Sequence, residues 1–389
     1  MGRTLPDSVI ETLRRMVRID SVNSALTGRP CAEAALCDWL EQTARGWGLV
    51  TRRLPVTDRA DQLLVTHEVG AGSPWLLLDS HMDTVAVDGM TVEPFGGELR
   101  GGRVYGRGAC DTKGTGAAML WALKEYAQNA RGPNNIALLF GVDEEVGMVG
   151  VDTFLKNDYP SLGFVPRGVI VGEPTELHPV IAHNGLVRWK VTTHGVAAHS
   201  SVPHEGRSAI RMMARLIGAI EDRYAAGLTA EHELTGRAAC SVNMIHGGSA
   251  PNIIPDTCVI DVDRRVVPGE DFAAVGPALV GVLDAVKEED PALNYTIQTL
   301  VTHPPLLPGG GGALLGTIKH TLSKLGLATL SLGAPFATHG SYYGRAGLPT
   351  VVLGPGEAHK AHTRNEYIST DQLERGARVY LGLMRAKLD

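Results

Sequence analysis

The sequence predicts an α/β protein with a second domain inserted into the first, and three observations support this prediction. Apolar segments of strand length alternate with helical segments over residues 1–178 and 304–389, a pattern typical of a mostly parallel sheet with helices on both faces. Residues 179–303 instead follow the order strand, helix, strand, strand, helix, strand, which indicates a ferredoxin-like α+β domain. The 389 residues are enough for two domains with cores of their own.

The first part of the main domain begins with two helices. Asp7 is expected to cap a helix that runs to Val17, and residues 32–47 carry apolar side chains at helical spacing. The glycine-rich segment 101–108 is expected to be a loop. Apolar runs bounded by polar residues predict strands, and periodic runs predict further helices: strands at 62–68, 75–78, 135–142 and 165–172, helices at 115–126 and from 151.

The insert and the return to the main domain follow. In the insert we expect strands at 185–193, 238–245, 257–262 and 293–300, and helices at 208–224 and 272–287. The segment 303–312, rich in proline and glycine, is expected to be the return linker. The main domain then resumes with a helix, a strand and a last helix: 313–325, 350–353 and from Thr370.

Composition excludes several classes of function. The net charge is -6 and no run of Lys or Arg stands out, so neither a nucleic acid nor an anionic membrane surface is expected as a partner. No apolar run approaches the roughly 20 residues of a membrane span, and the N-terminus lacks the apolar stretch of a signal peptide. The 5 cysteines form no CxxC pair, which argues against a disulfide framework or a thiolate zinc site. We therefore expect a cytoplasmic protein.

Residue types that bind metal ions recur where the predicted strands end. The positions are His81, Asp111 after the glycine-rich segment, Glu144 and Glu145, Glu173, and His362. Because ligands of open parallel sheets bind beyond the carboxyl ends of the strands, these side chains are expected to converge. Carboxylates together with imidazoles suit zinc, cobalt or manganese.

The spacing of His81 and Asp83 suggests how the first ligand is oriented. Residues two apart in an extended chain point to the same side, so the Asp83 carboxylate can hold one ring nitrogen of His81 while the other nitrogen faces a metal. Taken alone, this motif is equally compatible with a His–Asp pair that has only a structural role. A run such as Asp143-Glu144-Glu145 is, by itself, more often a solvated loop.

The charge of the candidate ligands favours two ions. Asp111, Glu145 and Glu173 together carry about -3, which two divalent ions and a bridging hydroxide nearly balance. Glu144 is then free to act as the base for that water. A phosphate-binding loop at Gly106–Gly114 is excluded, because Lys113 is followed by Gly114 and not by Ser or Thr.

Over nearly its whole length the chain resembles the zinc-dependent family of acetylornithine deacetylase, succinyl-diaminopimelate desuccinylase, aminoacylase and glutamate carboxypeptidase. The motifs that carry the resemblance are 80–85, 106–114, 143–147 and 172–175. The resemblance implies that Asp111 bridges two metals, and that the peptide bond after it is cis. It also implies His81 and Glu173 on one ion, Glu145 and His362 on the other, Asp83 as the residue that orients His81, and Glu144 as general base and later acid.

The insert resembles the lid and dimerisation domain of the same family. Its motifs are 194–200, 247–255 and 263–269. The resemblance implies that His199 donates to the substrate carbonyl oxygen, that Asn252 lies near the substrate, and that Arg265 pairs with a substrate carboxylate. Alone, such a His or Arg is more often a surface residue. The segment 337–341 departs from the family, because His339 follows Thr338 where members often have an acidic residue.

These observations lead to one functional prediction and two alternatives. We expect a two-metal amidohydrolase that removes the acyl group from an N-acyl amino acid, with zinc as the first choice of metal and cobalt or manganese as others. A metallocarboxypeptidase or dipeptidase would use the same residues, so a short peptide is the alternative substrate. A non-catalytic binding protein is disfavoured because Glu144 and every ligand are present. A homodimer through the insert is expected.

Overall fold

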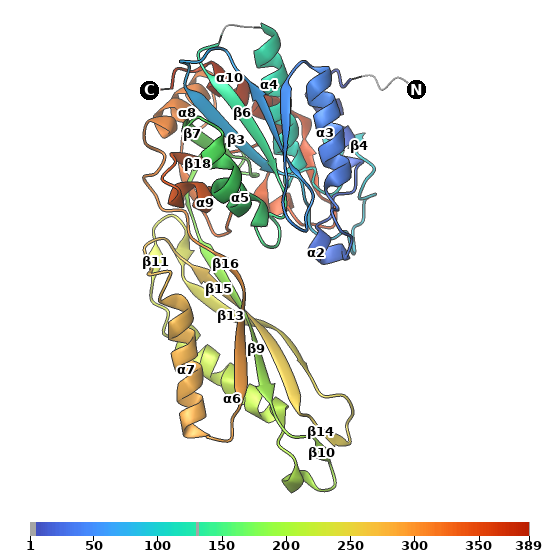
Figure 1. Cartoon of the computed structure of the whole chain (residues 1–389), viewed down its shortest axis with the longest axis vertical. Helices are drawn as coiled ribbons and strands as arrows, with labels where there is room; N and C mark the ends of the chain where they lie inside the picture. Colours follow the sequence, from blue (N-terminus) through green and yellow to red (C-terminus); the bar gives the residue numbers. More distant parts are fainter. Residues whose placement is uncertain (1–4, 130–131, 389) are drawn as a thin grey trace. The chain divides into compact units, whose positions relative to one another are not determined.

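The computed structural model describes residues 5–129 and 132–388, which form two compact units (Figure 1). The first unit comprises Met1–Ile181, Pro308–Leu332 and Thr338–Asp389, and the second comprises Ala182–Leu307 and Gly333–Ala337. The second unit thus includes a short returning segment, 333–337, that the sequence pattern does not indicate. None of the helices in the described parts of the chain is both long and apolar enough to span a membrane.

The main sheet has the strand order β1-β2-β6-β3-β7-β18-β8-β17. The central strands β6, β3, β7 and β18 are parallel to one another, whereas β1, β2 and β8 run antiparallel to their neighbours. The predicted α/β fold with a mostly parallel sheet is therefore confirmed. The bounds are β1 Val50–Leu54, β2 Gln62–His67, β3 Trp75–His81, β6 Asn135–Gly141, β7 Pro166–Val171, β8 Val180–His183, β17 Leu332–Ala334 and β18 Thr350–Val352.

Helices cover both faces of this sheet (Figure 1). One layer, which shares a continuous apolar core with the strands, contains α1 Val9–Val17, α3 Ala34–Gly46, α4 Lys113–Asn129, α8 Gly312–Lys324 and α10 Thr370–Arg385. The other face carries α5 Val149–Thr153 and α9 Gly340–Arg345. The short helix α2, Ser24–Thr27, follows α1.

Two local predictions are wrong. Ser8, and not Asp7, caps α1, because Ser8 has extended backbone angles and its hydroxyl accepts the N–H of Glu11 at 3.2 Å. The segment 101–108 is not entirely a loop, since β5 (Arg103–Tyr105) lies within it and pairs with β4 (Glu98–Arg100) and β19 (Tyr367–Ser369). Gly101 and Gly102, both with positive φ, make the tight turn between β4 and β5.

The second unit contains a fully antiparallel sheet with the strand order β13-β15-β9-β16. Alternate residues of β15 are buried beneath the two helices of this unit, α6 and α7, and this gives the unit its own apolar core. The predicted order of elements is confirmed: β9 Gly185–His194, α6 Ala209–Ala219, β13 Ala239–Gly247, β15 Thr257–Val266, α7 Val275–Glu289 and β16 Tyr295–His303. Two small ribbons complete it: β10 Ala198–His199 with β14 Ile253–Ile254, and β11 Glu231–His232 with β12 Gly236–Arg237.

Candidate metal centre

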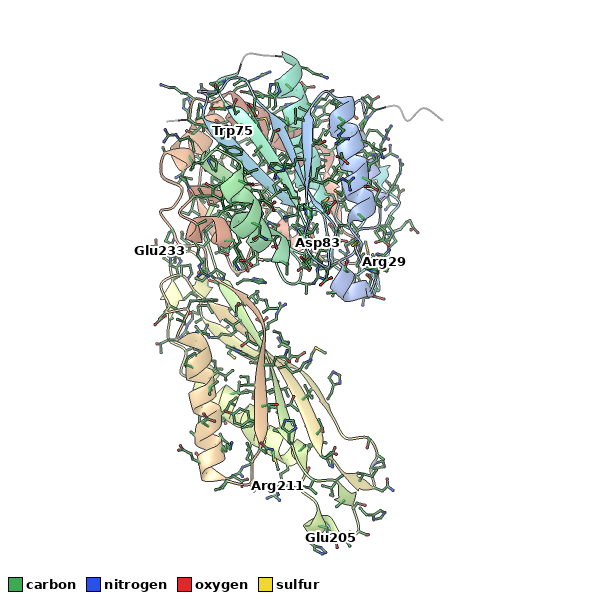
Figure 2. The ribbon with its side chains drawn as sticks, in the orientation of Figure 1. Arg29, Trp75, Asp83, Glu205, Arg211 and Glu233 are labelled. Carbon is green, nitrogen blue, oxygen red and sulfur yellow. The ribbon has the colours of Figure 1, made fainter. Side chains whose placement is uncertain are left out.

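The predicted ligands of the first unit come together where the parallel strands end. Trp75 begins β3 and Asp83 lies just beyond its end, so these two labels mark the two ends of the strand in Figure 2. His81 is the last residue of β3, while Glu144 and Glu145 follow β6 and Glu173 follows β7. Burial on both sheet faces forces these apolar strands side by side, and their polar ends meet as a result.

Asp111 occupies the middle of the cluster. Its Oδ1 lies 3.2 Å from Nε2 of His81, and its Oδ2 lies 3.3 Å from Nε2 of His362. Two ligands of one tetrahedral zinc ion are about 3.3 Å apart when each metal–ligand bond is about 2.0 Å. The Asp111 carboxylate thus has one oxygen directed to each of two histidines, the arrangement that a bridging ligand needs. The peptide bond between Asp111 and Thr112 is cis, in agreement with the family resemblance.

Glu145 and Glu173 complete the two sides of the cluster. Nε2 of His362 lies 3.1 Å from the Glu145 carboxylate, and Nε2 of His81 lies 4.0 Å from Oε1 of Glu173. Among the described residues, two groups have ligand atoms within 4.8 Å of one another: His81, Asp111 and Glu145, and His81, Glu144 and Glu173. The donor set therefore fits divalent ions, and Glu144 lies close enough to belong to the second group.

The acids and histidines of the cluster shift one another's pKa values. Burial and the neighbouring carboxylates raise the pKa of Glu173 well above its usual value, and burial raises the pKa of Glu144 to about 8. Although burial opposes it, hydrogen bonding to Asp111 and Glu145 raises the pKa of His362 to about 11. Similar hydrogen bonds from the two histidines outweigh burial and lower the pKa of Asp111. Because metal ligands must be deprotonated, ions bound here would displace these protons.

The carboxylate of Asp83 lies beside His81 and also makes contacts that we do not predict. The group nearest to Nδ1 of His81 is the main-chain carbonyl of Asp83, at 2.9 Å, whereas the carboxylate Oδ1 is 3.6 Å away. The carbonyl accepts the Nδ1 proton and leaves Nε2 free for a metal. The fully buried carboxylate also accepts the N–H groups of Glu144 at 3.0 Å and Glu145 at 3.1 Å. A buried carboxylate needs donors, and the chain after β6 supplies two.

Sequence reasoning missed several residues that hold this arrangement in place. Nδ2 of Asn23 donates to Asp83 at 2.8 Å and to Asp143 at 3.0 Å, and so links the ends of β3 and β6. Glu366 and Arg107 form a buried ion pair beside Asp111. Asn23 gives no signal in the sequence, because it is a single Asn before a short helix. The position of Glu366, four residues after the candidate ligand His362, is a signal that could have drawn attention to it.

His199, Asn252 and Arg265 all belong to the second unit. Pairing of β10 with β14 brings His199 opposite Ile253, and the main-chain oxygen of Asn252 accepts the N–H of Ser200 at 3.0 Å. His199 is exposed.

Arg265 lies at the end of β15, where its Nε donates to Asp263 at 2.7 Å. Asp263 also accepts from Arg188 at 2.8 Å. The three side chains line a hollow of about 530 Å³ on the sheet of this unit.

Comparison with known proteins identifies the family. The sequence model of peptidase family M20/M25/M40 matches residues 77–386. The chain belongs to this family. It is a metal-dependent hydrolase, as the cluster of carboxylates and histidines at its strand ends indicates.

Solved structures of the same fold cover almost the entire chain. A tripeptidase from Staphylococcus aureus is 23% identical, with 97% of each chain covered and a TM-score of 0.76. An M20 family metallo-carboxypeptidase from Sulfolobus solfataricus is 19% identical, with 98% of this chain and 99% of the other covered and a TM-score of 0.80. A dinuclear metal-binding M20 peptidase from Bacillus subtilis is 13% identical, with 97% and 96% covered and a TM-score of 0.70.

Proposed function

We propose that this M20 hydrolase removes the acyl group from an N-acyl amino acid and that it does so with two divalent ions. The observation that carries the proposal is the position of Asp111, whose two carboxylate oxygens face His81 and His362. Glu173 would complete the ligands on the His81 side, and Glu145 those on the His362 side. Zinc is the first choice, and cobalt or manganese also suit these ligand types.

When bound, the ions would lower the pKa of a bound water and polarise the carbonyl of the substrate. Glu144 is the residue that handles the proton in this proposal. It takes a proton as the water oxygen bonds to the carbonyl carbon, and it gives that proton to the nitrogen as the C–N bond breaks. The products are a carboxylic acid and a free amine. Its burial and its place beside Glu145 support this assignment.

Three residues of the second unit are proposed to bind the substrate. The main-chain N–H of Ser201 donates to Nδ1 of His199 at 3.2 Å, which leaves the ring proton on Nε2. This tautomer is a hydrogen-bond donor and supports a role for His199 at the carbonyl oxygen. Arg265 donates to Asp263 through Nε, so its two terminal nitrogens can pair with a substrate carboxylate. Asn252 is proposed to lie near the substrate.

The alternative is a metallocarboxypeptidase or dipeptidase, in which the scissile amide is a peptide bond. The tripeptidase and the metallo-carboxypeptidase among the similar structures favour this alternative. It needs the same ligands, the same base and the same carboxylate-binding Arg265.

We also propose that the protein is a cytoplasmic homodimer that pairs through the second unit. Strand β13 is at the edge of its sheet and exposes Met244 and Ile245, half of whose surfaces face solvent. An unpaired strand edge with apolar side chains favours pairing with a second copy. All five cysteines lie in the described residues and are free, which supports a reducing compartment.

A substrate screen on zinc-loaded protein tests the proposed function. N-acetyl, N-succinyl and N-formyl amino acids are compared with dipeptides and tripeptides, and free amine is measured. We expect the N-acyl amino acids to be cleaved best, chelation to abolish activity, and zinc or cobalt to restore it. Faster cleavage of peptides would establish the alternative. Activity that survives chelation would contradict both.

A further inference from the structure

The carboxylate of Glu366 is fully buried next to Asp111, and both of its oxygens accept hydrogen bonds. Oε1 accepts the main-chain N–H of Cys110 at 2.9 Å and that of Asp111 at 3.0 Å. Oε2 accepts from Nη1 of Arg107 at 2.6 Å. Glu366 is 0% exposed, so these contacts are shielded from water. The carboxylate therefore holds the main chain of Asp111 itself.

Arg107, which donates to Glu366, is itself fixed by hydrogen bonds to the main chain. Its Nε and Nη2 both donate to the main-chain oxygen of Ala86, at 3.1 and 2.9 Å. Because Arg107 neutralises Glu366, the pair adds no net charge beside the metal ligands. Its influence on the site is consequently one of geometry, and the charge balance of the ligands is unaffected.

Strand pairing explains why Glu366 reaches this position. β19 pairs with β5, with Tyr367 opposite Tyr105, and the main-chain oxygen of Glu366 accepts the N–H of Gly106 at 3.1 Å. The same segment carries His362, whose ring faces Asp111 and Glu145. The segment from His362 to Glu366 thus supplies one candidate ligand, His362. Through Glu366 it also holds the main chain of a second candidate ligand, Asp111.

We propose that Glu366 is a positioning residue for Asp111, with Arg107 as its partner. It fixes the main chain so that the two oxygens of Asp111 face His81 and His362 before any ion binds. The inference rests on the metal site of the proposed function and deepens it. Residues that orient metal ligands in this way typically change metal affinity by about 10- to 100-fold when they are replaced.

The test is metal affinity, measured on Glu366→Gln by competition with a chromogenic zinc chelator. Gln keeps the size of the side chain and one acceptor oxygen but loses the charge that pairs with Arg107. We expect affinity to fall by about 10- to 100-fold. The matched control is Glu357→Gln, which removes an acid nearby in the chain that pairs with His359 at 3.1 Å, and it should bind zinc as the wild type does.

Thermal unfolding of the metal-free proteins separates positioning from stability. If Glu366→Gln lowers the melting temperature but the folded protein binds zinc with wild-type affinity, the residue is only structural and the proposal is overturned. Arg107→Lys is the second variant in case Glu366→Gln does not fold. Lys cannot contact Ala86 and Glu366 with the same fixed geometry, so a smaller loss of affinity is expected. Unchanged affinity in this variant would likewise overturn the proposal.

The number of bound ions distinguishes this inference from the two-ion function. If the wild type binds a single ion, the two-ion function is wrong, but Asp111 still faces both histidines. Glu366→Gln must then weaken that single site by a similar factor. If the wild type binds two ions and only the variant binds them weakly, both the function and the inference are supported.

Discussion

The main-chain N–H of Glu144 donates to the buried carboxylate of Asp83 at 3.0 Å. The other carboxylate oxygen accepts the N–H of Glu145. One side chain at the end of β3 therefore sets the position of both acids that follow β6. Nδ1 of His81 contacts the main-chain carbonyl of Asp83 at 2.9 Å and lies 3.6 Å from its carboxylate.

The first prediction is that Asp83→Asn lowers turnover by about 100-fold or more while His81 keeps its ring orientation. An amide has a single acceptor oxygen, so one of the two N–H donors loses its partner, at a cost of about 1–3 kcal/mol. Glu144 and Glu145 then shift. Steady-state kinetics on zinc-loaded protein measure the effect. Asp88→Asn, an exposed Asp five residues further along the chain, is the control and should be unchanged.

The second prediction separates the two neighbouring acids. Glu144→Gln should retain both ions and lose about 10²- to 10⁴-fold in turnover, the size of a general acid–base contribution. Glu145→Gln should lose metal, because the Glu145 carboxylate lies 3.1 Å from Nε2 of His362. Elemental analysis together with kinetics decides between them. Loss of metal in Glu144→Gln with metal retained in Glu145→Gln would exchange the two roles.

The ligand cluster was predictable because two physical rules act together. Apolar strands such as β3 and β6 must be buried side by side, and this places the residues after them at one edge. Only some residue types at that edge can bind metals, which selects His81 and Glu145 from the sequence. Their convergence needs no knowledge of side-chain detail.

The supporting contacts were not predictable for an equally physical reason. Asn23 lies 60 residues before Asp83, and Glu366 lies 255 residues after Asp111. Each is a single polar residue in an irregular segment, so no periodicity indicates which main-chain groups it will meet. The Asp83 prediction was incomplete for the same reason: spacing placed its carboxylate beside His81, 3.6 Å from Nδ1, but could not show that two main-chain N–H groups also donate to it.

The third prediction concerns pH and stability. His183 is fully buried at the end of β8, and burial lowers its pKa from 6.5 to about 4. Between these values the unfolded chain binds a proton that the folded chain does not. The contribution of His183 to stability is therefore complete above pH 6.5 and is lost as the pH falls towards and through 4, by on the order of 3 kcal/mol in total.

Urea denaturation of the metal-free protein between pH 7 and 4.5 measures this dependence. His183→Asn retains a donor for the main-chain oxygen of Asn184, which the ring contacts at 2.9 Å, but does not titrate. Its stability should decline less than that of the wild type over this range. His204→Asn removes an exposed histidine and should follow the wild type. Equal declines in wild type and His183→Asn would contradict the prediction.

The fourth prediction concerns His199, which lies in the second unit, whereas Glu144 lies in the first. His199 can serve the metal site of its own chain or, in the proposed dimer, that of the partner chain, and the family resemblance favours the partner. His199→Ala should bind both ions normally. Its turnover should fall by about 10²- to 10³-fold, the typical worth of a donor aimed at a developing oxyanion.

Mixing two inactive variants tests delivery between chains. A heterodimer of His199→Ala and Glu144→Ala has one site with both residues intact, so an equal mixture should recover about a quarter of wild-type activity after subunit exchange. Glu144→Ala mixed with Glu173→Ala is the control, because each chain then has a damaged metal site of its own and no recovery is possible. If native mass spectrometry shows heterodimers of the first pair without recovered activity, His199 acts within its own chain or outside the reaction.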